Sequence, residues 1–345
     1  MNNFDLQKIV RPNIWALQPY SSARDEFTGS EGIFLDANEN PFGNNNRYPD
    51  PHQAKVKEGL SKLKGVSPDN IFIGNGSDEV IDLVYRIFCE PAKDSVIICP
   101  PTYGMYEVSA NINNVNIVKI PLTDDFQLNI DEIIKQDAKA VFVCSPNNPT
   151  GNILEGIETL LAKTNKLVVV DEAYIDFSNK ESLISKIDEY PNLLIMQTFS
   201  KAWGLAGARV GVAYANKSII TLMNKTKPPY NVSTLNQAVA INALADINKY
   251  KSEIEIILQQ REYLKESLTK LEIVKRIFPT DANFILIEVE DATMIYNQLV
   301  NKKIITRNRT SQVKNTIRIS VGTPEENKEL MAELKNIQQN KMIIK

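Results

Sequence analysis

The chain has 345 residues, enough for two domains or for one large domain with a smaller companion. Hydrophobic residues make up 43% of it and charged residues 23%, as in ordinary globular proteins, and the net charge of -3 gives no general attraction to nucleic acid or to an anionic membrane. His52 is the single histidine, which argues against a multi-histidine metal site and a Ser-His-Asp triad.

Cysteine content and the N-terminal sequence set further limits. The three cysteines are an odd number without a CxxC spacing, which argues against a disulfide framework. The first residues lack the basic and apolar regions of a secretory signal, and no apolar run approaches the roughly 18 residues of a membrane span. We therefore expect a cytoplasmic protein with neither nucleic-acid nor membrane partners.

The N-terminal part of the chain offers few regular elements. Residues 1–40 are predicted to be irregular, with one possible helix. Residues 53–64 have apolar side chains at helical spacing, and a helix there would end near Gly65.

A glycine-rich turn follows the first predicted strand. The strand at 71–73 leads into the sequence Gly-Asn-Gly-Ser-Asp-Glu and then into an apolar helix at 80–88. A strand, a glycine-rich turn and a helix start together present free backbone N–H groups and a helix dipole, which bind phosphate. A purely structural turn with Ser77 or Asp78 as the N-cap explains the same residues equally well.

Apolar strands alternate with helices in the next part of the chain. Such alternation predicts a mostly parallel sheet covered by helices on both faces, with ligands at the carboxyl ends of the strands. After about residue 235 the pattern becomes α+β. We predict an α/β protein with a large domain at 41–235 and a smaller α+β domain formed by 236–345 and the N-terminal segment 1–40. The expected strands lie at 95–99, 116–120, 140–144, 167–171, 193–196, 210–215, 283–289 and 316–321.

Lys201 lies just beyond the strand at 193–196, among small residues, hydroxyls and an arginine. A lysine in such a pocket loses hydration, which lowers its pKa and suits it to Schiff-base chemistry. Arg209 and the hydroxyls of Thr198 and Ser200 suit a phosphate. A carbonyl-trapping lysine beside a phosphate cradle suggests pyridoxal 5'-phosphate (PLP). For this segment alone, a solvated lysine with a structural arginine is an equally good interpretation.

Asp171 ends a run of aliphatic residues, and a carboxylate there needs a partner because burying it unpaired is costly. The N–H of a pyridinium ring is such a partner, and it keeps the ring able to accept electrons. Tyr174 and Asn148 lie near the ends of this strand and its neighbour, where they would reach the ring oxygen, and Tyr103 would lie on the ring face. A capping or arginine-paired Asp171 and a core Tyr103 are the competing interpretations.

Arg318 interrupts the apolar pattern of the strand at 316–321. A guanidinium in that position suits a carboxylate or a phosphate. A surface-facing strand arginine is the simpler interpretation of this position taken alone.

Eight groups of motifs occur in order along the chain: Asn38-Glu39-Asn40-Pro41, Asn46-Arg47-Tyr48-Pro49, Gly76-Ser77-Asp78-Glu79, Cys99-Pro100-Pro101-Thr102-Tyr103-Gly104-Met105-Tyr106, Cys144-Ser145-Pro146-Asn147-Asn148-Pro149-Thr150-Gly151, Asp171-Glu172-Ala173-Tyr174, Ser200-Lys201-Ala202 with Gly207-Ala208-Arg209, and Arg318-Ile319-Ser320-Val321-Gly322. Their order and spacing resemble those of the fold-type I PLP-dependent aminotransferases of the class II subgroup. Within that subgroup they resemble the histidinol-phosphate aminotransferases. The resemblance extends from about Arg11 to Gly322.

The resemblance implies a role around PLP for each matching residue. Lys201 would hold the cofactor covalently and act as acid and base, Asp171 would pair with the pyridine nitrogen, and Tyr103 would stack on the ring. Tyr174 and Asn148 would hold the ring oxygen, so the implied catalytic residues are Lys201, Asp171 and Tyr174. The cofactor phosphate would be bound by the backbone at Ser77 and Asp78, by Ser200, by Arg209 and, in the partner subunit's site, by Tyr48.

The resemblance also implies the substrate side and the assembly. Arg318 would bind the carboxylate of the amino-acid donor and, in the other half-reaction, the substrate phosphate. The role of Tyr48 implies a homodimer with shared active sites. The remaining substrate-binding residues would be Tyr20, Asn38, Asn283 and Arg307, with Arg309 as the alternative to Arg307.

The implied reaction moves an amino group from L-glutamate to imidazole-acetol phosphate, giving L-histidinol phosphate and 2-oxoglutarate in histidine biosynthesis. Aromatic or other amino-acid aminotransferases and phosphothreonine decarboxylases share the scaffold and are the alternatives. An NAD-dependent oxidoreductase is disfavoured because the turn after Ile73 lacks the dinucleotide-binding glycine spacing. A non-catalytic PLP-binding regulator is disfavoured because Lys201, Asp171 and Tyr174 are all present.

Overall fold

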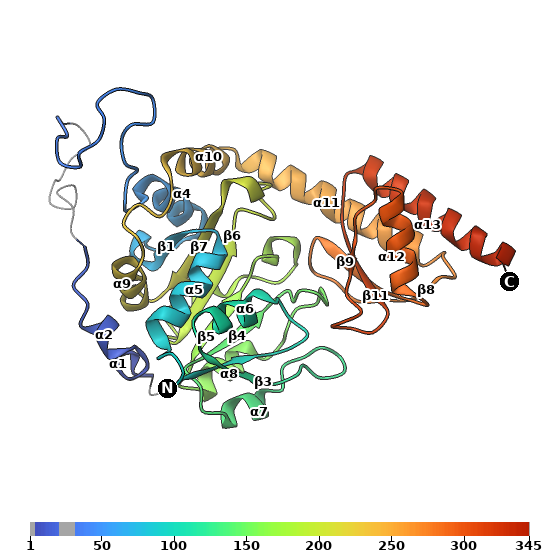
Figure 1. Cartoon of the computed structure of the whole chain (residues 1–345), viewed down its shortest axis with the longest axis horizontal. Helices are drawn as coiled ribbons and strands as arrows, with labels where there is room; N and C mark the ends of the chain where they lie inside the picture. The colour runs from blue at the N-terminus through green and yellow to red at the C-terminus, as the bar shows by residue number, and fades with distance from the viewer. Residues whose placement is uncertain (1–3, 21–31, 345) are drawn as a thin grey trace.

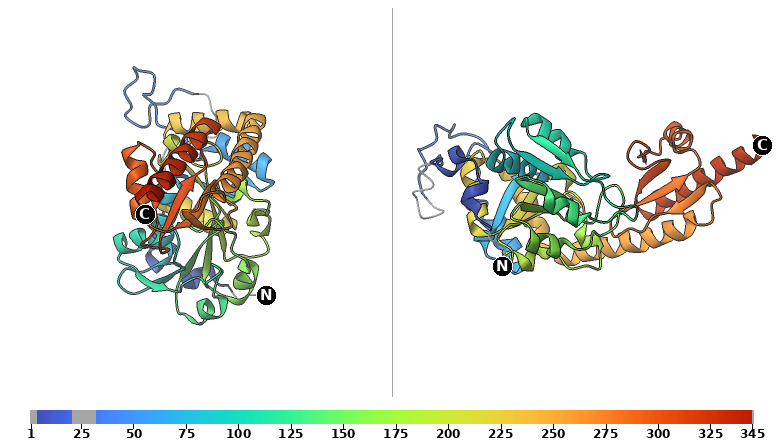
Figure 2. Two further views of the ribbon diagram at one scale, coloured as in Figure 1. Left: turned by 90° about the vertical axis from the view of Figure 1, so that its right-hand side faces the viewer. Right: turned by 90° about the horizontal axis from the view of Figure 1, so that it is seen from below.

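The computed structural model describes residues 4–20 and 32–344. It shows a large α/β part and a smaller α+β part, connected by the long helix α11 (Ile247–Leu268) (Figure 1). Seen from below, the smaller part continues along α11 away from the large sheet, and the two ends of the chain lie far apart (Figure 2). The expected fold class is therefore confirmed.

The large part is built on a seven-stranded sheet in the order β1-β7-β6-β5-β4-β2-β3. The strands from β6 to β3 are parallel to one another, and β7 is antiparallel to both of its neighbours. The strands of the middle, β4 to β7, are buried along their whole length. The bounds are β1 (Ile71–Asn75), β2 (Ser95–Ile98), β3 (Asn116–Lys119), β4 (Ala140–Cys144), β5 (Leu167–Asp171), β6 (Leu193–Thr198) and β7 (Val210–Ala215).

Helices cover both faces of this sheet because its strands are apolar on both sides. In β5, Val169 joins one hydrophobic cluster while Val168 and Val170 join the other. The first cluster includes α5 (Ser77–Phe88), α6 (Met105–Ile112) and α9 (Lys217–Thr226). The second includes α4 (Ala54–Lys64), α7 (Ile130–Lys135), α8 (Ile157–Lys163) and α10 (Thr234–Ala245).

The two short N-terminal helices, α1 (Leu6–Ile9) and α2 (Pro12–Trp15), pack on the large part. Val10 and Ile14 are buried in the first cluster, and the guanidinium of Arg11 pairs with Glu90 at 3.1 Å. The sequence prediction grouped residues 1–40 with the smaller domain. In the structure, Val10 and Ile14 pack into the first cluster of the large part, and the domain division itself stays a prediction.

The smaller part contains an antiparallel sheet in the order β10-β11-β9-β8. Its helices, α11, α12 (Ala292–Asn301) and α13 (Pro324–Ile344), bury a separate core with β9 and β11. A fourth cluster, which includes Tyr174, Ala202 and Phe284, joins the large part to α11 and β9. The strands are β8 (Val274–Ile277), β9 (Phe284–Val289), β10 (Arg307–Asn308) and β11 (Thr316–Ser320).

Most predicted elements of the large sheet are confirmed within a few residues, and the differences have local causes. The helix α5 begins at Ser77 with Gly76 as N-cap, at φ 77°, so the prediction of Ser77 or Asp78 as the cap is wrong. The region 236–270 forms two helices that separate at Asp246, whose side chain caps α11. Four short 3-10 helices complete the described structure: Pro68–Asn70, Ile175–Phe177, Leu183–Lys186 and Ala206–Ala208. In residues 4–20 and 32–344 no helix is both long and apolar enough to cross a membrane.

Candidate active site

A cavity of about 250 Å³ lies at the carboxyl ends of β4, β5 and β6, next to the start of α5. This is the edge of the sheet where the sequence places its polar motifs, because parallel strands bring their following loops together. Ten of the predicted site residues line the cavity: Ser77, Asp78, Tyr103, Asn148, Asp171, Tyr174, Ser200, Lys201, Arg209 and Arg318.

Asp171, the last residue of β5, is buried at the base of the cavity with 4% of its surface exposed. One carboxylate oxygen accepts a hydrogen bond from the hydroxyl of Tyr106 at 2.7 Å, and the other accepts from Ala173 N at 3.0 Å. Burial raises the pKa of Asp171, while these two hydrogen bonds and the charge of Lys201 lower it. A carboxylate held in this way retains lone pairs for a ring N–H in the cavity, so it fits a pyridinium partner.

Tyr106 contacts the predicted site residue Asp171, and the sequence analysis assigned it no role. It is fully buried, stacks on Phe142 at 4.9 Å between ring centres, and has its backbone carbonyl fixed by the hydroxyl of Tyr85. Its hydroxyl points to Asp171 rather than to solvent. In the sequence, Tyr106 could be singled out only by the general rule that a buried tyrosine hydroxyl needs a hydrogen-bond partner. The identity of that partner depends on contacts between distant parts of the chain.

Lys201 follows β6 and lines the same cavity as Asp171. Its amine lies 5.7 Å from the centre of the Tyr174 ring, and the side chain remains accessible to solvent through the cavity mouth. Burial by surrounding protein lowers the pKa of Lys201, the charge of Arg318 lowers it further, and Asp171 opposes both effects. A lowered amine pKa favours the neutral form that attacks a carbonyl group.

The end of the cavity near α5 is shaped for an anion. A Cβ atom on Gly76 would lie 2.5 Å from a terminal guanidinium nitrogen of Arg209, and one on Gly211 would lie 2.2 Å from Ser77 N. Glycine at 76 therefore lets the turn approach Arg209, and glycine at 211 lets the same turn pack closely on β7. Arg209 pairs with Asp78 at 3.2 Å and lies beside the free N–H groups of the first turn of α5. These donors fit a phosphate group.

Arg318 connects the small sheet to the large one. Its terminal nitrogen donates to the amide oxygen of Asn148, and its guanidinium lies 5.1 Å from the centre of the Phe284 ring. Because the Asn148 oxygen is occupied, its NH₂ group is the part left to donate to a ligand.

Five predicted residues do not line this cavity: Tyr20, Asn38, Tyr48, Asn283 and Arg307. Asn38 and Tyr48 line a separate groove with Ser233, Thr234 and Leu235, and the Tyr48 ring stacks on Tyr230 at 4.3 Å. Tyr20 is 72% exposed, at the end of a described segment.

The two candidate arginines of the small sheet differ in placement. Arg309 lines the cavity, whereas Arg307 lies opposite Arg318 in the sheet and is exposed. The preference for Arg307 over Arg309 therefore does not agree with the cavity lining in the single chain. Asn283 uses its backbone carbonyl to accept from Val321 N at 2.9 Å.

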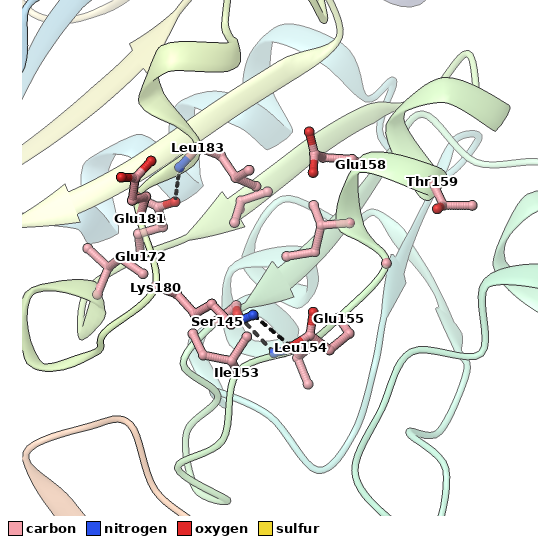
Figure 3. A pocket seen from close by; sticks show the side chains of 14 residues that line it. Ser145, Ile153, Leu154, Glu155, Glu158, Thr159, Glu172, Lys180, Glu181 and Leu183 are labelled. Carbon is pink, nitrogen blue, oxygen red and sulfur yellow. Dashed lines mark hydrogen bonds and ion pairs between the residues drawn. The ribbon is translucent and has the colours of Figure 1, made fainter.

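A second cavity lies away from this site, between β5 and α8 (Figure 3). It is bordered by Glu172, whose carboxylate accepts from Leu183 N at 2.9 Å and from Gln197 at 3.0 Å. In the same view, Leu154 N donates to the hydroxyl of Ser145 at 3.0 Å. The Glu172 contacts fasten the segment that carries Tyr174 to β6, so they support the main cavity.

Comparisons with known proteins agree with this geometry. Residues 30–334 match the family described as aminotransferase class I and II. The chain is 53% identical to a histidinol-phosphate aminotransferase of Flavobacterium johnsoniae over 97% of this chain and 99% of the relative. It is 50% identical to that of Bacteroides thetaiotaomicron over 96% and 99%.

Solved structures show the same likeness. The crystal structure of the histidinol-phosphate aminotransferase from Clostridium acetobutylicum has a TM-score of 0.79 at 26% identity, covering 86% of this chain and 92% of that one. The enzyme from Sinorhizobium meliloti, solved in complex with pyridoxal 5'-phosphate, has a TM-score of 0.79 at 25% identity, covering 85% and 83%. The chain therefore belongs to the class I and II aminotransferases and, within them, to the histidinol-phosphate aminotransferase family.

Proposed function

We propose that this protein is a PLP-dependent aminotransferase that moves an amino group from L-glutamate to imidazole-acetol phosphate. The products are 2-oxoglutarate and L-histidinol phosphate, and the reaction belongs to histidine biosynthesis. The observation that carries the proposal is the grouping of Lys201, Asp171 and Arg209 around one cavity. Relatives named histidinol-phosphate aminotransferase are about half identical to the chain over nearly its whole length.

The residues around the cavity fit PLP, which supplies an electron sink when bound. Lys201 would attach it through its amine, and Asp171, oriented by Tyr106, would accept the N–H of the ring nitrogen. The NH₂ group of Asn148 and the hydroxyl of Tyr174 would donate to the ring oxygen, and Tyr103 would lie on the ring face. The phosphate would take the backbone N–H groups of Ser77 and Asp78, the Ser200 hydroxyl and Arg209.

Lys201 would also carry the proton during the reaction. Once its amine is released from the cofactor, it would take a proton from the substrate carbon that bears the amino group and return it later. The lowered pKa of Lys201 keeps a larger share of the amine neutral and ready to accept that proton. Arg318 would fix the substrate by its anionic group.

We further propose a homodimer in which Tyr48, Tyr20 and Asn38 complete the partner's active site. The support is the apolar surface that this part of the chain exposes: Ile33, Leu35 and Phe42 are 92%, 87% and 82% exposed. Large apolar side chains exposed together indicate a contact surface. Asn283 and Arg307 would lie on the substrate side. The domain division at 41–235, and a cytoplasmic location, remain predictions.

The test is a single-turnover spectrum. The purified, PLP-loaded protein receives L-histidinol phosphate without a keto acid, and the absorption band of the lysine-bound cofactor should disappear within one turnover. Phenylalanine and phosphothreonine are run beside it and should react more slowly. A response to another amine without a response to histidinol phosphate would retain the cofactor and reject the substrate. The variant Lys201→Ala should not turn over repeatedly.

A further inference from the structure

Glu79, the third residue of α5, does not line the active-site cavity but is hydrogen-bonded to the turn that precedes the helix. One of its carboxylate oxygens accepts from the backbone N–H of Asn75 at 2.5 Å. A glutamate at this position of a helix ordinarily reaches back to the N–H of the N-cap residue. Here the N–H of the N-cap, Gly76, donates to Gly74 O at 2.9 Å instead. Glu79 therefore binds the turn one residue further back.

The backbone N–H groups of the turn and of the helix are used differently. Those of Asn75 and Gly76 are bonded within this segment. Ser77 and Asp78 line the cavity and begin the helix, where backbone N–H groups have no intrahelical acceptor. Because the two pairs are adjacent in the chain, the shape of the turn sets the direction of the helix N–H groups. A carboxylate that fixes the turn therefore also fixes the donors that face the cavity.

Asn231, 152 residues further along the chain, holds the Glu79 carboxylate in place. Its side-chain NH₂ group donates to the same oxygen of Glu79 at 2.8 Å and to Ile73 O at 3.0 Å. Its side-chain oxygen accepts from the amine of Lys227 at 3.1 Å. That amine is buried and also donates to two backbone carbonyl groups at 2.9 and 2.8 Å. Because both ends of the Asn231 amide are bonded, its orientation towards Glu79 is fixed.

We propose that Glu79 is a positioning residue for the cofactor phosphate and that Asn231 holds it in place. The proposal rests on the proposed function, which assigns the phosphate of PLP to the N–H groups of Ser77 and Asp78. Through its hydrogen bond to Asn75, the carboxylate keeps the turn in the shape that directs these N–H groups into the cavity. A negative charge that moved towards the cavity would repel a phosphate, and the two donors to Glu79 prevent that movement.

The experiment compares PLP with pyridoxal, which has the same ring and aldehyde but no phosphate. The dissociation constant of each is measured by absorbance titration of the cofactor-free protein. For Glu79→Ala we expect the PLP constant to rise about 10- to 30-fold, because the phosphate loses well-directed N–H donors. The pyridoxal constant should change less than about 2-fold, because Lys201 and Asp171 are unchanged. Glu79→Gln keeps an oxygen that accepts from Asn75 N, so both constants should stay within about 3-fold of wild type.

The contact between the two side chains is tested by Asn231→Asp. This variant keeps an oxygen for Lys227 but sets a second carboxylate against Glu79, so the PLP constant should rise at least about 10-fold. In the double variant Glu79→Gln/Asn231→Asp, the new amide can donate to the new carboxylate and still accept from Asn75 N. The double variant should therefore bind PLP within about 3-fold of wild type.

Glu132→Ala is the matched control, because Glu132 is the third residue of α7, pairs with Lys135 at 2.7 Å and lies outside the cavity. Both constants should be unchanged in this variant. In Glu79→Ala, an unchanged PLP constant would overturn the proposal, as would an equal rise of the PLP and pyridoxal constants. Equal losses in Glu79→Ala and Glu79→Gln would assign the effect to charge alone and would also overturn it.

Two further outcomes are decided by the same titrations. Should Glu79→Ala not fold, the ratio of the PLP and pyridoxal constants in Asn231→Asp and in the double variant decides the question, and a double variant no better than Asn231→Asp overturns the proposal. A wild-type protein that binds PLP but does not react with histidinol phosphate would reject the proposed substrate, while the titrations would still decide on Glu79.

Discussion

Arg318 of the small sheet donates a hydrogen bond to the side-chain oxygen of Asn148 in the large part. The contact spans 170 residues of sequence and closes one side of the active-site cavity. It has two chemical effects. It brings a guanidinium to the place where a substrate anion would bind, and it fixes the Asn148 amide so that its NH₂ group is left for the cofactor.

The variant Asn148→Asp separates these two effects. An aspartate keeps an acceptor for Arg318 and strengthens that contact into an ion pair, but it has no N–H to donate to the ring oxygen. We expect kcat to fall roughly 100-fold, as when one preorganised donor is lost, with little change in the thermal unfolding midpoint. The measurement is steady-state kinetics with a melting curve of the same sample. Full activity in Asn148→Asp would show that the Asn148 NH₂ group has no role in catalysis.

The hydrogen bond from Tyr106 to Asp171 predicts a change in pH dependence. Tyr106→Phe keeps the stacking on Phe142 but removes a hydrogen bond that lowers the pKa of Asp171. The pKa of Asp171 then rises further above its usual value, so the carboxylate becomes protonated at a higher pH as the solution is acidified. If activity requires ionised Asp171, the acidic limb of the kcat/KM profile moves to higher pH.

Tyr214→Phe is the matched control for this experiment. Tyr214 is also a fully buried tyrosine of the large sheet, but its hydroxyl has no hydrogen-bond partner among residues 4–20 and 32–344 and lies outside the cavity. Its removal should leave the pH profile unchanged. An acidic limb that stays in place in Tyr106→Phe would mean that Tyr106 only fills space beside Asp171.

Two glycines with similar backbone angles test whether the turn before α5 and Arg209 bind the cofactor phosphate. Gly76 and Gly65 have φ values of 77° and 70°, so an alanine at either position costs about 1 kcal/mol of folding free energy from backbone strain. A Cβ on Gly76 also meets Arg209 at 2.5 Å, whereas one on Gly65 has nothing within 4 Å in the part of the chain that the structure describes. Gly76→Ala should therefore weaken PLP binding at least about 10-fold, and Gly65→Ala should not.

The two glycine variants are compared by PLP titration and by urea unfolding of the cofactor-free protein. Similar losses of unfolding free energy with different PLP affinities would support binding of the cofactor phosphate at the turn before α5. Equal PLP affinities in the two variants would place the cofactor phosphate elsewhere.

The sequence was most informative where chemistry is encoded in neighbouring residues. Lys201 beyond a buried strand, and Asp171 at the end of another, were assigned to one sheet edge because parallel strands bring their carboxyl ends together, and both line the cavity. The glycine-rich turn before α5 was also placed correctly. Its cap was misassigned to Ser77 or Asp78 because the close approach of Arg209 to Gly76 is a long-range contact.

Other features depended on contacts that no local pattern records. The composition of β7 does not reveal its antiparallel direction, which arises because the chain turns back along β6 after the loop at 199–209. The hydroxyl of Tyr106 meets Asp171 across 65 residues, and the cavity lining by Arg309 depends on how the small sheet faces the large one. A role in a second subunit, as proposed for Tyr48, depends on residues of that subunit and cannot be inferred from contacts within one chain.

The repulsion between Arg318 and Lys201 gives a prediction for the cofactor-free protein. Arg318 is, after burial, the main cause that lowers the pKa of Lys201. Replacing it by an uncharged side chain of similar length, Arg318→Met, removes this repulsion, so the Lys201 pKa rises towards its usual value and less neutral amine is present at a given pH.

The rate at which added PLP attaches to the protein should then increase with pH along a curve displaced to higher pH. Stopped-flow absorbance between pH 6 and roughly pH 10 measures that curve, within the range where free lysine is still protonated. Arg276→Met, which changes an arginine outside the cavity, serves as the control and should keep the wild-type curve. A displacement to lower pH in Arg318→Met, or none at all, would mean that Arg318 does not control the charge on Lys201.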